Sequence, residues 1–274
     1  MIWLPIVSWV MFALVTTFHS IGIYLLTKED SLNARFYLMS LSVSEIWSAL
    51  IVAIYLSLDV KYKLALYVVI IIAHTMKAPY YFSMFILTLD RFCEIYLHMS
   101  YSNTWFYMNK IKVILFGWVF WIGHMIFLFI FVAHYDFRID MKLKAIDIGN
   151  GFHLALSGVL IFQFLMVYGY IDVKMCAANR GNNIKFGAVP FLVMVTFSLF
   201  VVIPNVLVVL DRAKFFFSVI IIKQINSVCD ALIYIFTQER IRGRFLNMFR
   251  SHCSTSPLST LERSASNPLV TTRI

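Results

Sequence analysis

Thr88-Leu89-Asp90-Arg91-Phe92 ends one long apolar stretch of the sequence, and Asn226-Ser227-Val228-Cys229-Asp230-Ala231-Leu232-Ile233-Tyr234 lies near the end of another. Ionisable side chains are rare in membrane-spanning helices because burying a charge in lipid is costly, and they usually mark function. The two strings therefore predict a switch that connects the outside of a membrane with a cytoplasmic partner. Their spacing, together with the apolar stretches around them, also decides the fold class.

The composition of the chain favours a membrane location. Hydrophobic residues make up 61% of the 274 residues and charged residues only 14%, whereas a soluble domain carries about 25% charged residues. A membrane-crossing helix needs about 20 mostly apolar residues, and strand-like alternation is absent. We therefore expect an all-α fold, a seven-transmembrane helix bundle with a short amphipathic eighth helix. The expected spans are 4–26, 35–57, 64–92, 111–133, 153–175, 187–210 and 214–236.

The distribution of Lys and Arg predicts the orientation. Fourteen of the 23 lie on the side of the 27–35, 92–111 and 174–186 loops and the C-terminus, and seven lie on the other side. The side richer in Lys and Arg is generally cytoplasmic, so we expect a plasma-membrane protein with its N-terminus outside and its C-terminus in the cytoplasm. The net charge of +9 then reflects topology and contact with membrane lipid. The sequence contains no nucleic-acid-binding module, so we expect no nucleic-acid partner.

The segment after the last expected span predicts a surface helix followed by a tail. Apolar and basic side chains recur there at helical spacing, namely Ile241, Phe245, Leu246 and Phe249 beside Arg240, Arg242 and Arg244. Such a helix lies on an anionic membrane leaflet. Cys253 follows it and is either a palmitoylation site or a free thiol. Residues 250–274 are rich in Ser and Thr and are expected to form a disordered cytoplasmic tail, which leaves 1–249 as the helical domain.

Taken together, the motifs resemble those of class A (rhodopsin-like) G protein-coupled receptors over nearly all of residues 4–249. Asp90-Arg91-Phe92 is similar to the family's DRY motif, and Asn226–Tyr234 is similar to its NSxxNPxxY motif. Further similarities, in chain order, are those of Leu41–Glu45 to the second-helix LAxAD, Trp118 to the fourth-helix Trp, Pro204 to the Pro of the sixth-helix CWxP, and Ile241 and Phe245 to the apolar anchors of the eighth helix. The short loops resemble those of the smaller members, such as melanocortin and adenosine receptors.

The resemblance implies a receptor that passes an extracellular ligand signal to a heterotrimeric G protein by helix rearrangement, with arrestin and a receptor kinase as further partners. In this family's mechanism, Asp90 would hold Arg91 in the resting state. On activation Arg91 would move toward Tyr168 or Tyr170, and Tyr234 would move inward. The cytoplasmic loops beside these residues would complete the face that binds the G protein.

The chain also departs from the family pattern. Ala231 stands in place of the seventh-helix Pro and Asp230 in place of the Asn, while Phe92 replaces the last residue of DRY within the switch. Pro204 would be the sixth-helix hinge, but the family's toggle Trp is absent before it. The first-helix Gly-Asn corresponds to His19-Ser20, and no external cysteine pair is present for a disulfide. These departures predict altered signalling efficiency but leave the expected fold unchanged.

Glu45 and Asp230 form a second candidate site. In the family, the corresponding positions face each other around a sodium ion, and Asn226 and Ser227 stand close by in this sequence. Two neighbouring carboxylates do not both stay ionised without a counter-charge, so the pair should hold a sodium ion or share a proton. The alternative is a pair separated by packing or by water. We expect no other cofactor and no transition-metal site.

A third candidate site lies in the outer half of the expected bundle. His74, Lys77 and Tyr81 stand at positions i, i+3 and i+7 and so share one helical face. Lys77 lies roughly 21 Å from Arg91 along a helix, and Lys223 should have a similar depth. Two ammonium groups in one cavity repel each other unless an anion binds between them, which suggests a pocket for an acidic ligand with a carboxylate or phosphate. The alternative is structural pairing or snorkelling of the two lysines.

Two other functions stay open on the sequence alone. The intramembrane charges Glu45, Lys77, Lys223 and Asp230 would also suit a seven-span transporter, channel or proton-conducting protein. Such a protein needs neither the Asp90-Arg91 string nor the amphipathic helix. The missing Trp and Pro leave room for a receptor-like chain that does not signal. An enzyme is not expected, because the sequence contains no nucleophile, metal or phosphate motif.

Overall fold

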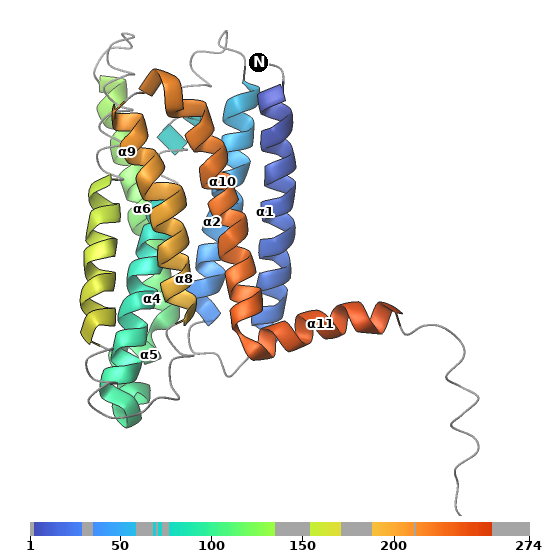
Figure 1. Cartoon of the computed structure of the whole chain (residues 1–274). Helices are drawn as coiled ribbons and strands as arrows, with labels where there is room; N and C mark the ends of the chain where they lie inside the picture. The colour runs from blue at the N-terminus through green and yellow to red at the C-terminus, as the bar shows by residue number, and fades with distance from the viewer. Residues whose placement is uncertain are drawn as a thin grey trace, which may run out of the picture.

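Long helices run along a common axis in the computed structural model, and a last helix turns away from them at one end (Figure 1). The structure describes residues 3–28, 35–58, 68–69, 71–72, 77–134, 154–170, 188–210 and 212–253. Across these ranges the secondary structure is helical and no strand occurs, which confirms the expected all-α class. The helices are α1 (Trp3–Thr27), α2 (Arg35–Ser57), α4 (Lys77–Leu97), the 3₁₀ helix η1 (His98–Asn103), α5 (Trp105–Met108), α6 (Lys110–His134), the helix Leu154–Tyr170, α8 (Ala188–Phe197), the π-helix η3 (Ser198–Val202), α9 (Ile203–Leu210), α10 (Arg212–Thr237) and α11 (Glu239–Cys253).

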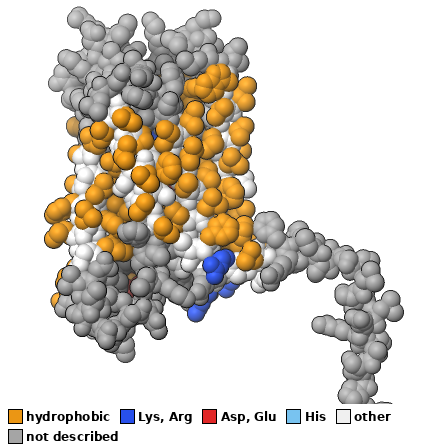
Figure 2. All heavy atoms as spheres, in the orientation of Figure 1, with side chains coloured by type: hydrophobic (Ala, Val, Ile, Leu, Met, Phe, Trp, Pro, Cys, Tyr) orange, Lys and Arg blue, Asp and Glu red, His pale blue; other side chains and the backbone are white. Residues whose placement is uncertain are grey.

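The outer surface of the helices is apolar. Figure 2 shows hydrophobic side chains spread over the middle of one face, while Lys and Arg side chains gather at the lower end beside the start of α11. In the part of the chain that the structure describes, three helices are long and apolar enough to cross a membrane, namely α1, α2 and the Lys110–Phe127 part of α6. Exposed apolar area of this extent is stable in lipid rather than in water. The chain is therefore a helical membrane protein.

The remaining expected spans coincide with helices that are shorter or more polar. Leu154–Tyr170 and Leu192–Leu207 are apolar but short among the described residues. The helices α4 and α10 are long, but α4 carries Asp90 and Arg91 and α10 carries Lys223 and Asp230, which lower their hydropathy. The polar strings that suggested a switch therefore lie on the two least apolar of the long helices.

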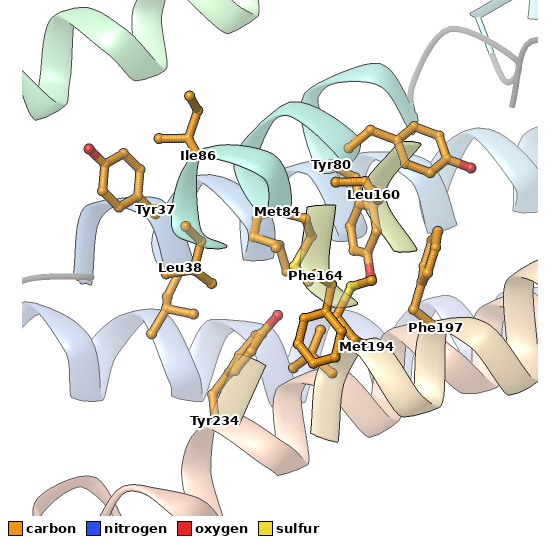
Figure 3. Packing of buried hydrophobic residues seen from close by; sticks show 14 of the residues in the cluster. Tyr37, Leu38, Tyr80, Met84, Ile86, Leu160, Phe164, Met194, Phe197 and Tyr234 are labelled. Carbon is orange, nitrogen blue, oxygen red and sulfur yellow. The ribbon is translucent and has the colours of Figure 1, made fainter. Parts of the chain in front are cut away.

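The centre of the bundle is formed by α2 and α10. α1 packs against both of them, α4 packs against α2 and α6, and α10 also packs against α8 and α9. Large buried side chains from several of these helices meet in one cluster (Figure 3). Tyr37 and Leu38 come from α2, Met84 from α4 and Tyr234 from α10, and each is at most 2% exposed. Glu45 of α2 and Asp230 of α10 are fully buried among these helices.

The prolines explain two features of the helix boundaries. The expected third span ran from 64 to 92 and included Pro79, but α4 begins at Lys77, so Pro79 lies in the first helical turn, where its missing N–H is not needed. The expected sixth span is split into α8, η3 and α9. Pro204 is the second residue of α9, which begins directly after η3, and the N–H of Ile203 bonds to the carbonyl of Ser198 five residues earlier. A π-turn of this kind re-routes the carbonyls that a proline cannot satisfy.

The last two helices differ from the sequence expectation only at their ends. α10 is one uninterrupted α-helix through Ala231, as expected for a segment that lacks the family's proline. α11 continues to Cys253, past the expected end at Phe249, because residues 250–253 contain neither Gly nor Pro to stop it. Arg244 Nη1 donates a hydrogen bond to the carbonyl oxygen of Lys28, which fixes α11 against the end of α1.

Candidate functional site

Asp230 is a buried side chain on which several hydrogen bonds converge. It is fully buried on α10 and accepts hydrogen bonds from the Tyr80 hydroxyl of α4 at 3.1 Å, from Thr196 Oγ1 of α8 at 3.2 Å and from Asn226 Nδ2 of its own helix at 3.0 Å. Donors that point at a carboxylate stabilise its ionised form. Asp230 therefore joins three helices through one carboxylate.

A second polar group lies just under one turn before Asp230 on the same helix and connects α1, α2 and α10. Ser227 Oγ donates to Oε2 of Glu45, which is also fully buried. The carbonyl oxygen of Ser227 lies 2.8 Å from Nε2 of His19, another fully buried side chain. A carbonyl oxygen only accepts hydrogen bonds, so Nε2 of His19 carries the hydrogen. We call His19, Glu45, Asn226, Ser227 and Asp230 the polar junction.

The structure thus brings together all four residues of the expected ion or proton site. Their hydrogen bonds divide them into two neighbouring groups, with Glu45 bonded to Ser227 and Asp230 bonded to Asn226. Both carboxylates lie within electrostatic range of the Tyr80 hydroxyl. Within the described ranges, no group of three or more His, Cys, Asp and Glu side chains could hold a metal ion. The junction can bind a proton or distribute one among its members.

Sequence reasoning missed His19 and Tyr80 as members of this region. The alignment to the family's first helix placed the polar Asn position at Ser20, but Ser20 is exposed and His19 points inward. A lone histidine in a 25-residue apolar helix was the available signal, because a polar ring in lipid needs a partner. Tyr80 carried no comparable signal, since it is one of 14 tyrosines in the chain.

The Asp90-Arg91 string lies at the end of α4 where the short helices begin. Asp90 is fully buried and accepts a hydrogen bond at Oδ1 from the hydroxyl of Tyr101 in η1. The ring of Tyr101 in turn packs edge-on against Tyr107 of α5, with 5.2 Å between ring centroids. Lys110 Nζ lies 4.0 Å from the Tyr107 ring centroid, a cation–π contact. Arg91 belongs to α4, but its side chain lies outside the described residues, so its expected pairing with Asp90 stays a prediction.

The expected partners of the switch lie in different surroundings. Phe92 stacks on Tyr96 with 5.7 Å between ring centroids and meets Tyr170 edge-on at 5.5 Å. Tyr168 instead packs against Phe164 in the core, with ring centroids 4.2 Å apart. Of the two tyrosines considered as targets for Arg91, Tyr170 is thus the one in contact with the Asp90-Arg91-Phe92 string.

Tyr234 has an unusual environment for a hydroxyl group. It is 1% exposed, and its ring points from α10 into the buried cluster (Figure 3). Its hydroxyl has no hydrogen-bond partner in the part of the chain that the structure describes. A buried polar atom left unpaired costs about 1–3 kcal/mol, so this position is strained relative to one in which the hydroxyl finds a partner.

The expected ligand pocket is described only in part. His74 and the side chain of Lys77 lie outside the described residues. Tyr81 is 4% exposed and packs in the core, and its hydroxyl accepts a hydrogen bond from Ser157 Oγ at 3.4 Å. Lys223 is half-buried on α10, one turn before Ser227. The acidic-ligand pocket therefore stays a prediction.

The two remaining expected residues are placed by their backbone. Pro204 is buried and is the second residue of α9, two residues after η3 ends, and its role as a hinge stays a prediction. Cys253 is the last residue of α11, and its side chain lies outside the described residues, so palmitoylation stays a prediction.

Comparison with known proteins adds no relative. The chain matches no known family model, and no curated protein matches it. The candidate sites therefore rest on their own chemistry.

Proposed function

We propose that the chain is a seven-transmembrane receptor of the class A type that transmits an extracellular ligand signal to a heterotrimeric G protein across the plasma membrane. In this proposal the N-terminus is outside, and α11 lies on the cytoplasmic leaflet. The seven proposed spans would include α1, α2, α4, α6, the helix Leu154–Tyr170, α8 to α9, and α10.

The observation that carries the proposal is the buried carboxylate of Asp90 at the end of α4. Its hydrogen bond from Tyr101 joins the end of a bundle helix to the segment that follows it. A buried carboxylate is costly to strip of a hydrogen-bond partner, so this contact holds the segment in place while it lasts. Moving α4 or the segment breaks it, which suits a two-state switch read by a cytoplasmic partner.

Tyr234 and the π-turn support a bundle with a second state. The unpaired hydroxyl of Tyr234 would gain a hydrogen bond if α10 or its neighbours shifted. The π-turn between α8 and α9, followed by Pro204, weakens the regular hydrogen-bond ladder at one place. Strain at one residue and a flexible point in a neighbouring helix together permit a defined rearrangement.

The proposal is tested by G-protein activation in cells across the Gα families, with surface expression matched. Arg91→Ala should abolish basal and ligand-stimulated activation shown by the wild type. Lys112→Ala is the matched control, because Lys112 is an exposed cation on α6 near the same end of the bundle, and it should keep wild-type activity. Equal activity in wild type and Arg91→Ala, or activity in neither, would refute coupling through this string.

A seven-span proton or ion transporter is the second candidate, and the polar junction favours it. His19, Glu45, Ser227 and Asp230 place titratable and hydroxyl groups across several helices. Charge movement through such a protein would be lost in Asp230→Asn and unaffected by Arg91→Ala. A proteoliposome flux assay with both variants therefore separates the two functions, since the receptor proposal expects no flux from either the wild type or the variants.

A further inference from the structure

We propose that Lys110 is a positioning residue whose ammonium group holds the segment of η1 and α5 against α4, so that Tyr101 reaches Asp90. The inference deepens the proposed function and rests on it in one respect, because there the Tyr101–Asp90 hydrogen bond belongs to the resting state. The hold of Lys110 on the segment can be measured without any signalling assay. Through this contact α6 takes part in the switch together with α4.

A continuous chain of contacts runs from Lys110 to Asp90 through two tyrosine rings. Lys110 is the first residue of α6 and is 8% exposed. Its Nζ lies 4.0 Å from the ring centroid of Tyr107 and 5.6 Å from that of Tyr101. The two rings meet edge-on, and the Tyr101 hydroxyl donates to Oδ1 of Asp90. The elements α6, α5, η1 and α4 therefore meet in one cluster at the foot of α4 (Figure 1).

The segment between these contacts is hydrogen-bonded within itself. The hydroxyl of Thr104 donates to the carbonyl oxygen of Tyr101 at 2.7 Å and accepts from the N–H of Tyr107 at 3.2 Å. The backbone N–H and the side-chain amide of Asn109 both donate to the carbonyl oxygen of Trp105, each at 3.0 Å. Thr104 thus links the two tyrosines, so a hold on the ring of Tyr107 also sets the place of Tyr101.

The burial of its ammonium group gives Lys110 a reason to stay against the rings. Lysine is almost never fully buried without a partner, because its charge loses water on burial. The face of an aromatic ring is electron-rich and attracts a cation, more strongly where water is excluded. Tyr101 thus meets a carboxylate with its hydroxyl and lies near an ammonium group with its ring. Opposite charges on one tyrosine favour the position in which the segment is closed on α4.

The test is hydrogen–deuterium exchange of residues 101–109 in the full chain, purified in detergent. The N–H groups of Thr104, Met108 and Asn109 are hydrogen-bonded within the segment, so they exchange when it comes loose and unfolds. Lys110→Met keeps the apolar stem without the charge and should speed this exchange at least about fivefold. Lys110→Arg keeps a cation that also packs on aromatic faces and should stay within about twofold of the wild type. Lys112→Met removes an exposed cation of the same helix and should have no effect.

Two further variants identify the ring as the partner. Tyr107→Phe keeps the ring face and should resemble the wild type, whereas Tyr107→Leu should exchange as fast as Lys110→Met. In the Tyr107→Leu background, Lys110→Met should add little, because both changes remove the same contact. The inference is overturned if Lys110→Met exchanges like the wild type, if Lys110→Arg exchanges as fast as Lys110→Met, or if the two removals are additive. Should Lys110→Met not fold, faster exchange in Tyr107→Leu than in Tyr107→Phe supports the inference, and equal exchange overturns it.

Basal G-protein activation at matched surface expression connects the contact with the proposed function. Lys110→Met should raise it and Lys110→Arg should not. In the Tyr101→Phe background Lys110→Met should raise it no further, since the Asp90 bond is already lost. Faster exchange in Lys110→Met without activation by any form of the chain would refute the proposed function and leave the hold of Lys110 on the segment in place. Faster exchange with unchanged activation in a chain that does signal would overturn the part of Lys110 in the switch.

Discussion

Replacing Tyr80 by Phe isolates one hydrogen bond of Asp230. The substitution keeps a ring that is 1% exposed and lies 5.8 Å from the Phe197 ring centroid, and it removes only the hydroxyl that donates to Asp230 Oδ2. Asp230 keeps its donors Thr196 and Asn226. The variant therefore measures how much a single donor to a buried charge contributes to the stability of the bundle.

The loss of folding free energy expected for Tyr80→Phe can be bounded by two sets of measured hydrogen-bond contributions. Hydrogen bonds to charged groups contribute about 1.5–3 kcal/mol in soluble proteins. Those between membrane helices average about 0.6 kcal/mol and reach about 1.7 kcal/mol. Because the acceptor is a fully buried carboxylate, we expect Tyr80→Phe to lose about 1.5 kcal/mol of folding free energy. For a chain of this size that loss lowers the melting temperature by about 3–6 °C.

Tyr81→Phe is the matched control for this measurement. Tyr81 is the next residue, is 4% exposed and also lies 5.8 Å from the Phe197 ring centroid. Its hydroxyl takes part in a long bond of 3.4 Å from the neutral Ser157, so its loss should cost less than about 0.6 kcal/mol. Thermal unfolding of both variants in the same detergent gives the comparison. A Tyr80→Phe variant that is no less stable than Tyr81→Phe would refute the role of Asp230 as the charge that joins these helices.

Two other substitutions test close contacts elsewhere. In Gly117→Ala the new Cβ would overlap Cδ1 of Phe82, so we expect a loss of about 1–3 kcal/mol from overpacking between α6 and α4, read by thermal unfolding. Gly123→Ala on the same helix is the control, because its new Cβ meets nothing within 4 Å and the substitution should be neutral or stabilising. Equal changes in melting temperature for the two variants would contradict the close contact between Gly117 and Phe82. Tyr101→Phe removes the hydroxyl donor of Asp90. It should lower the free energy of unfolding by about 1–2 kcal/mol and raise basal G-protein activation. If both quantities are unchanged, the Tyr101–Asp90 hydrogen bond does not hold the resting state.

The sequence was sufficient to predict the elements but not their rotation about their own axes. Apolar length located α1, α2 and α6, and helical spacing of Arg and apolar residues located α11, because both signals are local. Which side of a helix faces a neighbour depends on partners far away in the chain. His19 and Ser227 are 208 residues apart, and Tyr80 and Asp230 are 150 apart. A rotation of one residue, about 100° of helix, was enough to exchange His19 for Ser20.

The candidate sites were predictable to the extent that charge alone marks them. Glu45 and Asp230 were identified because an acid in an apolar helix is costly, and both prove to be fully buried. The donors that surround them were not identifiable, because tyrosine, threonine and serine are ordinary residues in such helices. Which donor serves which carboxylate is a property of packing and not of composition.

The carbonyl oxygen of Ser227 connects two departures from the family pattern. α10 is an uninterrupted α-helix, so the N–H of Ala231 bonds to the carbonyl four residues before it, which is that of Ser227. A proline at 231 would have no such hydrogen. The oxygen has two lone pairs, and here Ala231 uses one and His19 uses the other. Loss of the His19 bond consequently leaves this oxygen satisfied by its own helix and costs little on that side. The His19 bond would therefore matter more to this oxygen if residue 231 were a proline than it does with Ala231 in place.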